Sequence, residues 1–168
     1  MDNKNTKVLT AATLLSCVIS AHAFADIQIL GSESEISQSI TEHYQQSSQY
    51  YNGSLAKNDA LYINVATASD DDINKAKSHI YQGDIVIIDL RQIPGEDAKI
   101  ELSQSLAGLG SDSPLVVTGV YQGDKIINSI VADVQDENGQ SINNPTAELE
   151  SLNHSLVHAL DRLGFGGE

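Results

Sequence analysis

Two histidines near the end of the chain have a spacing that could do chemistry. His154 and His158 are four residues apart, so both side chains would leave one face of a helix, as a metal half-site requires. Asp161 lies one turn further on and could add an oxygen ligand. Zinc-peptidase helices share this spacing, but Ser155 stands where such an enzyme needs its glutamate base, so that mechanism is absent. The competing interpretation is two solvent-facing histidines opposite a leucine stripe, which we favour.

A run of aspartates is the second candidate. Asp70, Asp71 and Asp72, together with Asp89, could form an oxygen-rich site for magnesium or calcium, because hard cations prefer several carboxylates at once. However, acidic residues in the first turn of a helix are expected without any metal, since they complement the helix dipole. We therefore assign no metal ligand, and a metal-binding or metal-dependent hydrolytic domain remains the alternative hypothesis.

The motifs of the common enzymes are missing from the sequence. It contains no Gly-x-Ser-x-Gly elbow, no Gly-x-Gly-x-x-Gly after its first strand and no Gly-x-x-x-x-Gly-Lys-Ser/Thr loop. We therefore predict a protein that is not an enzyme and uses no cofactor. With 9 Lys and Arg against 23 Asp and Glu, the formal net charge is −14, which disfavours nucleic acid and anionic lipid as partners.

The elements that position these residues are organised around one strand, residues 84–90. Four consecutive β-branched residues, Ile85 to Ile88, lie between two carboxylates, so neither face of the strand can meet water. Such a strand belongs in the middle of a parallel sheet with helices on both sides. The fold class predicted for residues 26–168, as a single domain, is therefore a three-layer α/β sandwich of flavodoxin-like or Rossmann-like type.

The remaining elements follow from periodicity and turn residues. A short apolar lead at 27–30 is a candidate edge strand, and Ser32 to Glu35 matches a capping box. We expect helices at 36–51, 70–82, after 94–95 and at 145–163, and strands at 60–66, 84–90, 114–121 and 125–134. Two successive crossovers would make the first three of these strands parallel, and 125–134 would return as an antiparallel edge strand.

Ligands bind at the carboxyl ends of parallel strands in this architecture. The residues expected there are Thr67 to Ser69, Asp89 to Arg91, and Thr118 with Gly119. A small molecule bound between the first two groups is a further hypothesis that the sequence leaves open.

The first 25 residues are typical of an export signal. A weakly basic start precedes an apolar run at 8–19, which is too short to span a bilayer comfortably, and small residues end at Ala25. Cleavage there would leave Asp26 as the mature start and a periplasmic or secreted product. Alternatively, residues 14–17 could serve as a lipoprotein box that acylates Cys17. Under ordinary cleavage the mature chain would contain no thiol.

Two surfaces are candidates for binding a protein partner. One is the tyrosine-rich end of the first predicted helix, with Tyr44, Tyr50 and Tyr51, although we favour the interpretation that these rings cap the edge of the core. The other is the edge strand that carries Lys125 and Ile127, because an exposed edge can accept another strand.

The layout of the whole chain carries a resemblance. Its parts are the signal at 1–25, the Ser- and Gln-rich segment 36–51, the apolar strand 84–90 and the ending Leu-Asp-Arg-Leu-Gly-Phe-Gly-Gly at 160–167. In this layout the chain resembles the secretion accessory proteins encoded beside vibrio-type pore-forming cytolysins (haemolysins). The resemblance implies a chaperone-like or export-assisting role for a partner toxin, with no catalytic residues to transfer. We therefore expect an exported, non-enzymatic accessory protein.

Overall fold

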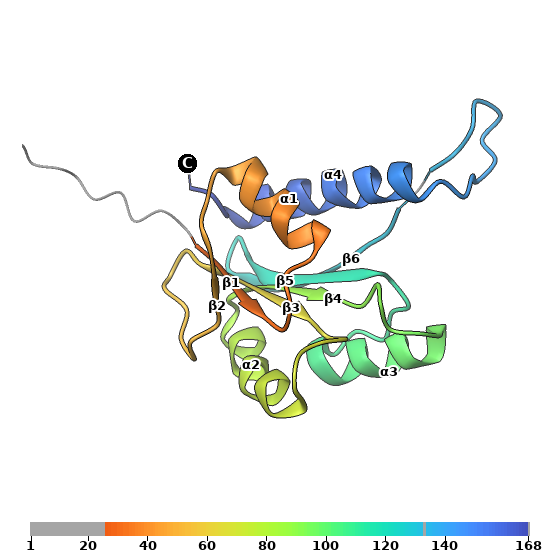
Figure 1. The fold of residues 1–168 in the computed structure, drawn as a ribbon. Coiled ribbons are helices and arrows are strands. Elements are labelled where there is room, and N and C mark those ends of the chain that lie inside the picture. The colour runs from red at the N-terminus through yellow and green to blue at the C-terminus, as the bar shows by residue number, and fades with distance from the viewer. Residues whose placement is uncertain (1–25, 133, 168) are drawn as a thin grey trace, which may run out of the picture.

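The computed structural model describes residues 26–132 and 134–167, so the predicted signal and Cys17 lie outside the described residues. The chain forms one six-stranded sheet covered on both faces (Figure 1). Helices α1 (Glu35–Tyr44) and α4 (Pro145–Leu163) cover one face, and α2 (Asp70–Gln82) and α3 (Glu96–Ala107) cover the other. The predicted three-layer α/β sandwich is confirmed. Within the described ranges, none of the helices is long and apolar enough to cross a membrane.

The sheet is mixed, with most strands running the same way. Its strands are β1 (Ile27–Leu30), β2 (Ser48–Tyr50), β3 (Ala60–Asn64), β4 (Ile85–Asp89), β5 (Leu115–Tyr121) and β6 (Asp124–Ile130). Their order is β2-β1-β3-β4-β5-β6, in which β1 to β4 pair in parallel and β5 is antiparallel to both of its neighbours.

Strand β4 lies in the core, as its sequence predicts. Val86, Ile87 and Ile88 have no exposed surface. Ile87 packs with the apolar side chains under α1 and α4, whereas Val86 and Ile88 pack with those over α2 and α3. The strand therefore connects the two halves of the core, as a strand without a polar face must.

The prediction that residues 27–30 form an edge strand is wrong. Strand β1 lies inside the sheet, where Ile27 pairs with Ser48 of β2 on one side and Ala60 of β3 on the other. Its four residues are all buried. The apolar segment at 27–30 is too short for its sequence to show that a second strand, β2, pairs with its other side.

The first helix is shorter than predicted. It ends at Tyr44, because Gln45 adopts a left-handed conformation (φ 53°), and residues 48–50 extend along β1 as β2. Serine has a low propensity for helix interiors, which favours an early end to the helix. Pairing of residues 48–50 with β1 also satisfies the backbone hydrogen-bonding groups on the outer side of β1. The cap is also shifted from the prediction, since Ser34 rather than Ser32 accepts the hydrogen bond from the Ser37 amide.

The direction predicted for the strand at 114–121 is also wrong. Val86 of β4 pairs with Thr118 and Asp89 with Leu115, so β5 runs antiparallel to β4. A buried serine in the middle of α3 explains the reversal. Ser103 Oγ accepts from the Ser111 amide at 2.9 Å and donates to the Ser111 carbonyl at 2.8 Å. The chain therefore doubles back along α3 before β5 begins.

Strands β5 and β6 form the predicted antiparallel edge hairpin, although β6 ends at Ile130 rather than at 134. The two-residue turn has positive φ at Gln122 (54°) and Gly123 (92°), as a type I′ turn requires. In such a hairpin the pair that flanks the turn is hydrogen-bonded, and the pairs alternate from there. Lys125, Ile127 and Ser129 therefore direct their backbone N–H and C=O groups away from β5.

The last helix matches its prediction closely. Asn144 Oδ1 accepts from the Ala147 amide at 3.2 Å, Pro145 occupies the first turn and Gly164 ends the helix. Its buried residues include Leu152, Leu156 and Leu160.

A matched pair of substitutions tests the central place of β4. Ile87→Ala should lower the free energy of unfolding by about 2–5 kcal/mol, because it leaves a cavity in a packed core. The same substitution at Ile100, which is 41% exposed on α3, should have a much smaller effect. Urea denaturation measures both, and equal losses of stability would contradict the buried position of β4.

Candidate functional site

The place where this fold class usually binds ligands is filled by the protein itself. Strand β1 connects through α1 to β2 on one side, and β3 connects through α2 to β4 on the other, so a crevice is expected between the carboxyl ends of β1 and β3. A Cβ at Gly31 would lie only 2.6 Å from Thr67 Oγ1. The Ser32 amide also donates to Thr67 Oγ1 at 2.8 Å. The loops that follow β1 and β3 are therefore in contact where this crevice would open.

A buried polar network occupies the next position along the same edge. Asp89, at the end of β4, is 2% exposed. Arg91 donates to it from Nε at 3.1 Å and from Nη2 at 2.9 Å. The Tyr62 hydroxyl donates to Asp89 Oδ2, and Ser34 Oγ bonds both to Tyr62 and to Arg91 Nη2. The network ties the start of α1 to β3 and β4.

The network changes the acid–base properties of its members. Burial, followed by the charge and the hydrogen bond of Asp89, raises the pKa of Tyr62 well above its ordinary value. Burial disfavours the charged guanidinium of Arg91, but the hydrogen bonds and charge of Asp89 outweigh it and raise the pKa of Arg91. A buried carboxylate needs this compensation because desolvation costs several kcal/mol. The network is internally satisfied, and we assign it a structural role.

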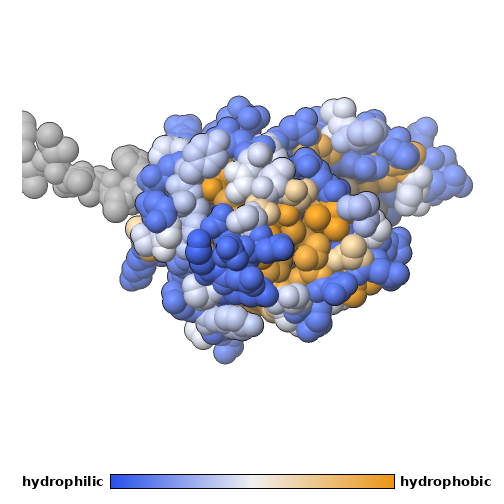
Figure 2. Space-filling view, turned by 60° about the horizontal axis from the view of Figure 1, so that its bottom comes forward, coloured by the Kyte–Doolittle hydropathy of each residue, from blue (hydrophilic) through white to orange (hydrophobic). Residues whose placement is uncertain are grey.

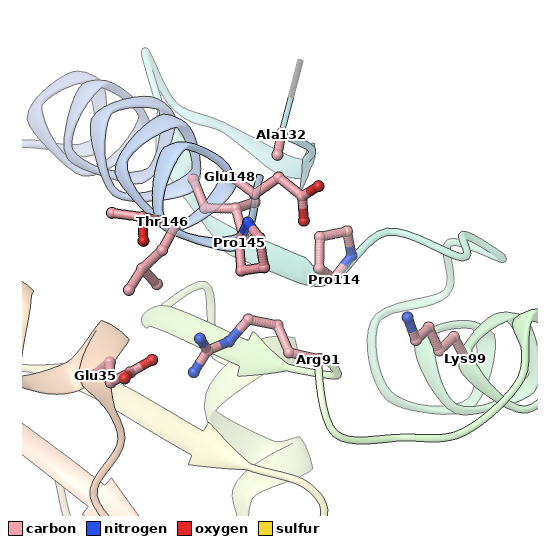
Figure 3. A pocket seen from close by; sticks show the side chains of 10 residues that line it. Glu35, Arg91, Lys99, Pro114, Ala132, Pro145, Thr146 and Glu148 are labelled. Carbon is pink, nitrogen blue, oxygen red and sulfur yellow. The ribbon is translucent and has the colours of Figure 1, made fainter. Parts of the chain in front are cut away.

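Beside the network lies an open groove at the carboxyl-end edge of the sheet. A cavity of about 500 Å³ is bordered by Glu35, Arg91, Lys99, Pro114 and Glu148 (Figure 3). A second cavity, of about 340 Å³, shares Pro114, Ala132 and Glu148 with the first. We call the two together the carboxyl-end groove. Its position was not predicted, because Pro114 comes to this edge through the reversed direction of β5.

The residues predicted for a metal site are not brought together. Asp72 accepts from Ser69 Oγ at 2.7 Å and pairs with Lys75 at 3.1 Å, while Asp89 is held by Arg91. His154 is exposed on α4. In residues 26–132 and 134–167, no group of three or more His, Cys, Asp or Glu side chains could hold a metal ion.

His158 is also exposed on α4. Asp161, the third member of that candidate set, accepts a hydrogen bond from the Tyr44 hydroxyl at 2.8 Å. Thr118 and Gly119, expected near Asp89, lie toward the opposite end of the sheet because β5 is reversed.

The three predicted partner-binding tyrosines are in different environments. Tyr44 donates to Asp161 and packs its ring against Phe165 at 4.9 Å, so it joins α1 to the end of α4. The Tyr51 hydroxyl bonds to His79 Nε2 at 2.7 Å. Tyr50, on the edge strand β2, is 74% exposed. Of the three, Tyr50 is the one whose ring is largely exposed, and its assignment to partner binding stays a prediction.

The predicted edge-strand residues, Lys125 and Ile127, are exposed. Ile127 is 39% exposed, and Lys125 donates a hydrogen bond to the Tyr81 carbonyl. Val120, on the same side of the hairpin as Ile127, is also 39% exposed. Figure 2, which brings the α2 and α3 side forward, shows hydrophobic side chains gathered on this face among hydrophilic ones. The assignment of Lys125 and Ile127 to partner binding stays a prediction.

Comparison with known proteins gives one full-length match. The chain is 56% identical over 168 residues to the "Cytolysin secretion protein" of Vibrio vulnificus (strain CMCP6), covering 100% of this chain and 99% of that protein. No protein-family model matches the chain, and no solved structure matches it.

Removing the carboxylate of the buried network should be costly. Asp89→Asn leaves the Arg91 guanidinium largely buried without its partner, and should lower the free energy of unfolding by about 3 kcal/mol. Asp72→Asn, which breaks an exposed pair with Lys75, is the matched control and should change stability little. Chemical denaturation compares the two, and an Asp89 variant as stable as the control would refute the buried ion pair.

The raised pKa of Tyr62 predicts a loss of stability in alkali. Because this phenol ionises at higher pH in the folded than in the unfolded chain, the folded chain binds more protons above about pH 10. The stabilisation is complete below that pH and declines as the pH rises further. Urea midpoints measured between about pH 8 and 11.5 should fall less steeply in Tyr62→Phe than in the original chain. Parallel curves would exclude this role for Tyr62.

Proposed function

The chain belongs to the family of the cytolysin secretion protein of Vibrio vulnificus, and from this premise we propose that it is an exported accessory protein for a partner cytolysin. In this role it assists the folding or secretion of the toxin and catalyses no reaction. The full-length similarity to that relative carries the proposal, together with the relative's name. The apolar segment at 8–19 and the small residues that end at Ala25 support a periplasmic or secreted location.

The internal pairing of the polar residues supports a non-enzymatic role. Catalytic groups must reach a substrate, yet Asp89 has both carboxylate oxygens bonded within the protein, and Arg91 and Tyr62 are its donors. The crevice expected between β1 and β3 is filled by Gly31 and Thr67. The proposed activity is therefore the binding of another polypeptide.

The outer edge of β6 is the surface we assign to this binding. An unpaired edge is a template for another strand, and long edges are usually protected by charge, bulges or a covering element. Strand β6 is seven residues long, and Lys125, Ile127 and Ser129 direct backbone groups outward from it. An added strand would gain hydrogen bonds to these groups and an apolar contact with Ile127. The opposite edge, β2, is three residues long and offers Tyr50 as a smaller second contact.

Two substitutions at one position separate backbone pairing from side-chain contact. Ile127→Pro removes an outward N–H while leaving the hydrogen bonds between β5 and β6, and Ile127→Ala removes the side chain but keeps the N–H. In a strain whose chromosomal gene is deleted, the proline variant should lower cytolysin in the medium toward the level of the deletion. The alanine variant should restore most secretion. Haemolytic activity and toxin immunoblots of the medium provide the measurement.

Separate controls test whether the variants fold and which edge of the sheet binds the partner. Circular dichroism and thermal melting check that the proline variant is folded, and Ser129→Pro repeats the test at a second outward N–H. Tyr50→Ala probes the β2 edge. If both folded proline variants support normal secretion, binding through β6 is wrong. If the deletion itself leaves secretion unchanged, the accessory role fails.

A further inference from the structure

We propose that the carboxyl-end groove binds an extended segment of the partner polypeptide in which basic residues alternate with apolar ones. This inference rests on the accessory role proposed above and specifies the chemistry of the segment that is recognised. It follows from the shape of the groove, from its unpaired charges and from its position at the end of β6.

The groove is open to solvent, and its lining combines apolar side chains with polar and charged ones. Its two cavities adjoin at Pro114, Ala132 and Glu148. Leu152, which is buried, borders the first cavity, and Val131, which is 53% exposed, borders the second. A channel lined in this way suits the side chains of an extended chain, because apolar groups leave water while the backbone stays accessible at the open side.

Exposed apolar surface continues onto the neighbouring segment. Residues 134–144 project beyond the sandwich between β6 and α4 (Figure 1). Ile142 of this segment borders the second cavity and is 40% exposed. Val131 and Ile142 together extend the apolar lining beyond the end of the sheet.

The unpaired charges of the groove are mostly negative. Glu35, Asp112 and Glu148 line it, and within the described part of the chain their carboxylates have no hydrogen-bond or ion-pair partner. Lys99 is unpaired as well, whereas the charge of Arg91 is compensated by Asp89. Three carboxylates against one ammonium favour a cationic segment, and the net charge of −14 acts in the same direction at longer range.

The groove begins where the β6 edge ends. Strand β6 stops at Ile130, and the next residues, Val131 and Ala132, border the groove. A strand added along β6 spans about 23 Å over seven residues and would then arrive at this channel. One continuous segment can therefore pair with β6 and place its next residues beside Glu148 and Asp112.

A second copy of the chain fits the groove less well than a basic partner. It would bring the same excess of carboxylates to a surface that already has three unpaired ones, so the two copies would repel one another. Self-association is therefore an outcome of the test that would count against the proposal.

A direct test measures peptide binding by fluorescence anisotropy. The probe is a labelled ten-residue peptide of alternating Lys and Val, with Glu-Val and Lys-Ser peptides of the same length as controls. The protein variants are Glu35→Gln/Asp112→Asn/Glu148→Gln and a matched control, Glu42→Gln/Asp71→Asn/Glu101→Gln, which removes three exposed carboxylates outside the groove. Both carry the same net charge, so only the position of the removed carboxylates differs.

We expect the Lys-Val peptide to bind the unaltered chain more tightly than either control peptide. The groove variant should weaken its binding about tenfold, and the control variant less than about twofold. Equal weakening by both variants would mean general attraction to an acidic protein and would overturn the proposal. Absence of Lys-Val binding, or a concentration-dependent dimer in sedimentation that the groove variant abolishes, would overturn it too.

The groove variant also distinguishes a failure of the groove proposal from a failure of the accessory role. The secretion assay uses a strain in which deletion of the gene blocks export of cytolysin. If the groove variant restores normal export in that strain, the groove proposal is wrong and the accessory role stands. Unchanged export in the deletion strain would instead remove the accessory role, whatever the peptide measurements show.

Discussion

The burial of β4 on both faces is the constraint on which the rest of the structure depends. Since Val86, Ile87 and Ile88 have no exposed surface, the chain must supply a helical layer on each side and a strand on each flank. It supplies α1 and α4 above, α2 and α3 below, and β3 and β5 alongside. After β6 the one remaining element is α4, which covers a face of the sheet. The outer edge of β6 is thus left without a neighbouring strand within the described residues.

The end of β4 adds a second constraint. Asp89 is a buried carboxylate, and it is stabilised by donors from Tyr62 and Arg91 rather than left available to a ligand. The crevice between β1 and β3 is filled in a similar way, by the contact of Gly31 with Thr67. The polar residues at the edge where such sheets usually do chemistry therefore hold the loops together. We therefore propose that recognition takes place at the surface, along the β6 edge and in the groove next to it.

The sequence predicts the layers better than the neighbours of each strand. Burial of residues 86–90, the caps of α2 and α4 and the turn of the β5–β6 hairpin depend on local patterns, and all are confirmed. The errors concern contacts between distant segments. The short run at 27–30 does not reveal that β2 would cover its outer side, and no pattern in 96–114 shows that Ser103 would turn the chain back.

In the candidate site, too, features that depend on local sequence were predictable and contacts between distant segments were not. Asp89 and Arg91 are recognisable as strand-end residues, but their pairing with Tyr62 and Ser34 depends on how β3 and α1 meet. Tyr44 has a partner 117 residues away, Asp161, so its role in joining two helices cannot be read from neighbouring positions. The free edge of β6 was predictable because a strand that ends a hairpin and is followed by a helix often lies at the border of a sheet.

The most direct measurement of the central claim is amide hydrogen exchange of the chain with and without the purified cytolysin that we propose as its partner. Pairing at the edge predicts that exchange slows at Lys125, Ile127 and Ser129, whose N–H groups point outward, and continues to slow at Val131. Exchange in β4 should not change, because that strand is already buried. Unchanged exchange along β6 in a demonstrated complex, or slowing confined to β2 and α1, would contradict the account.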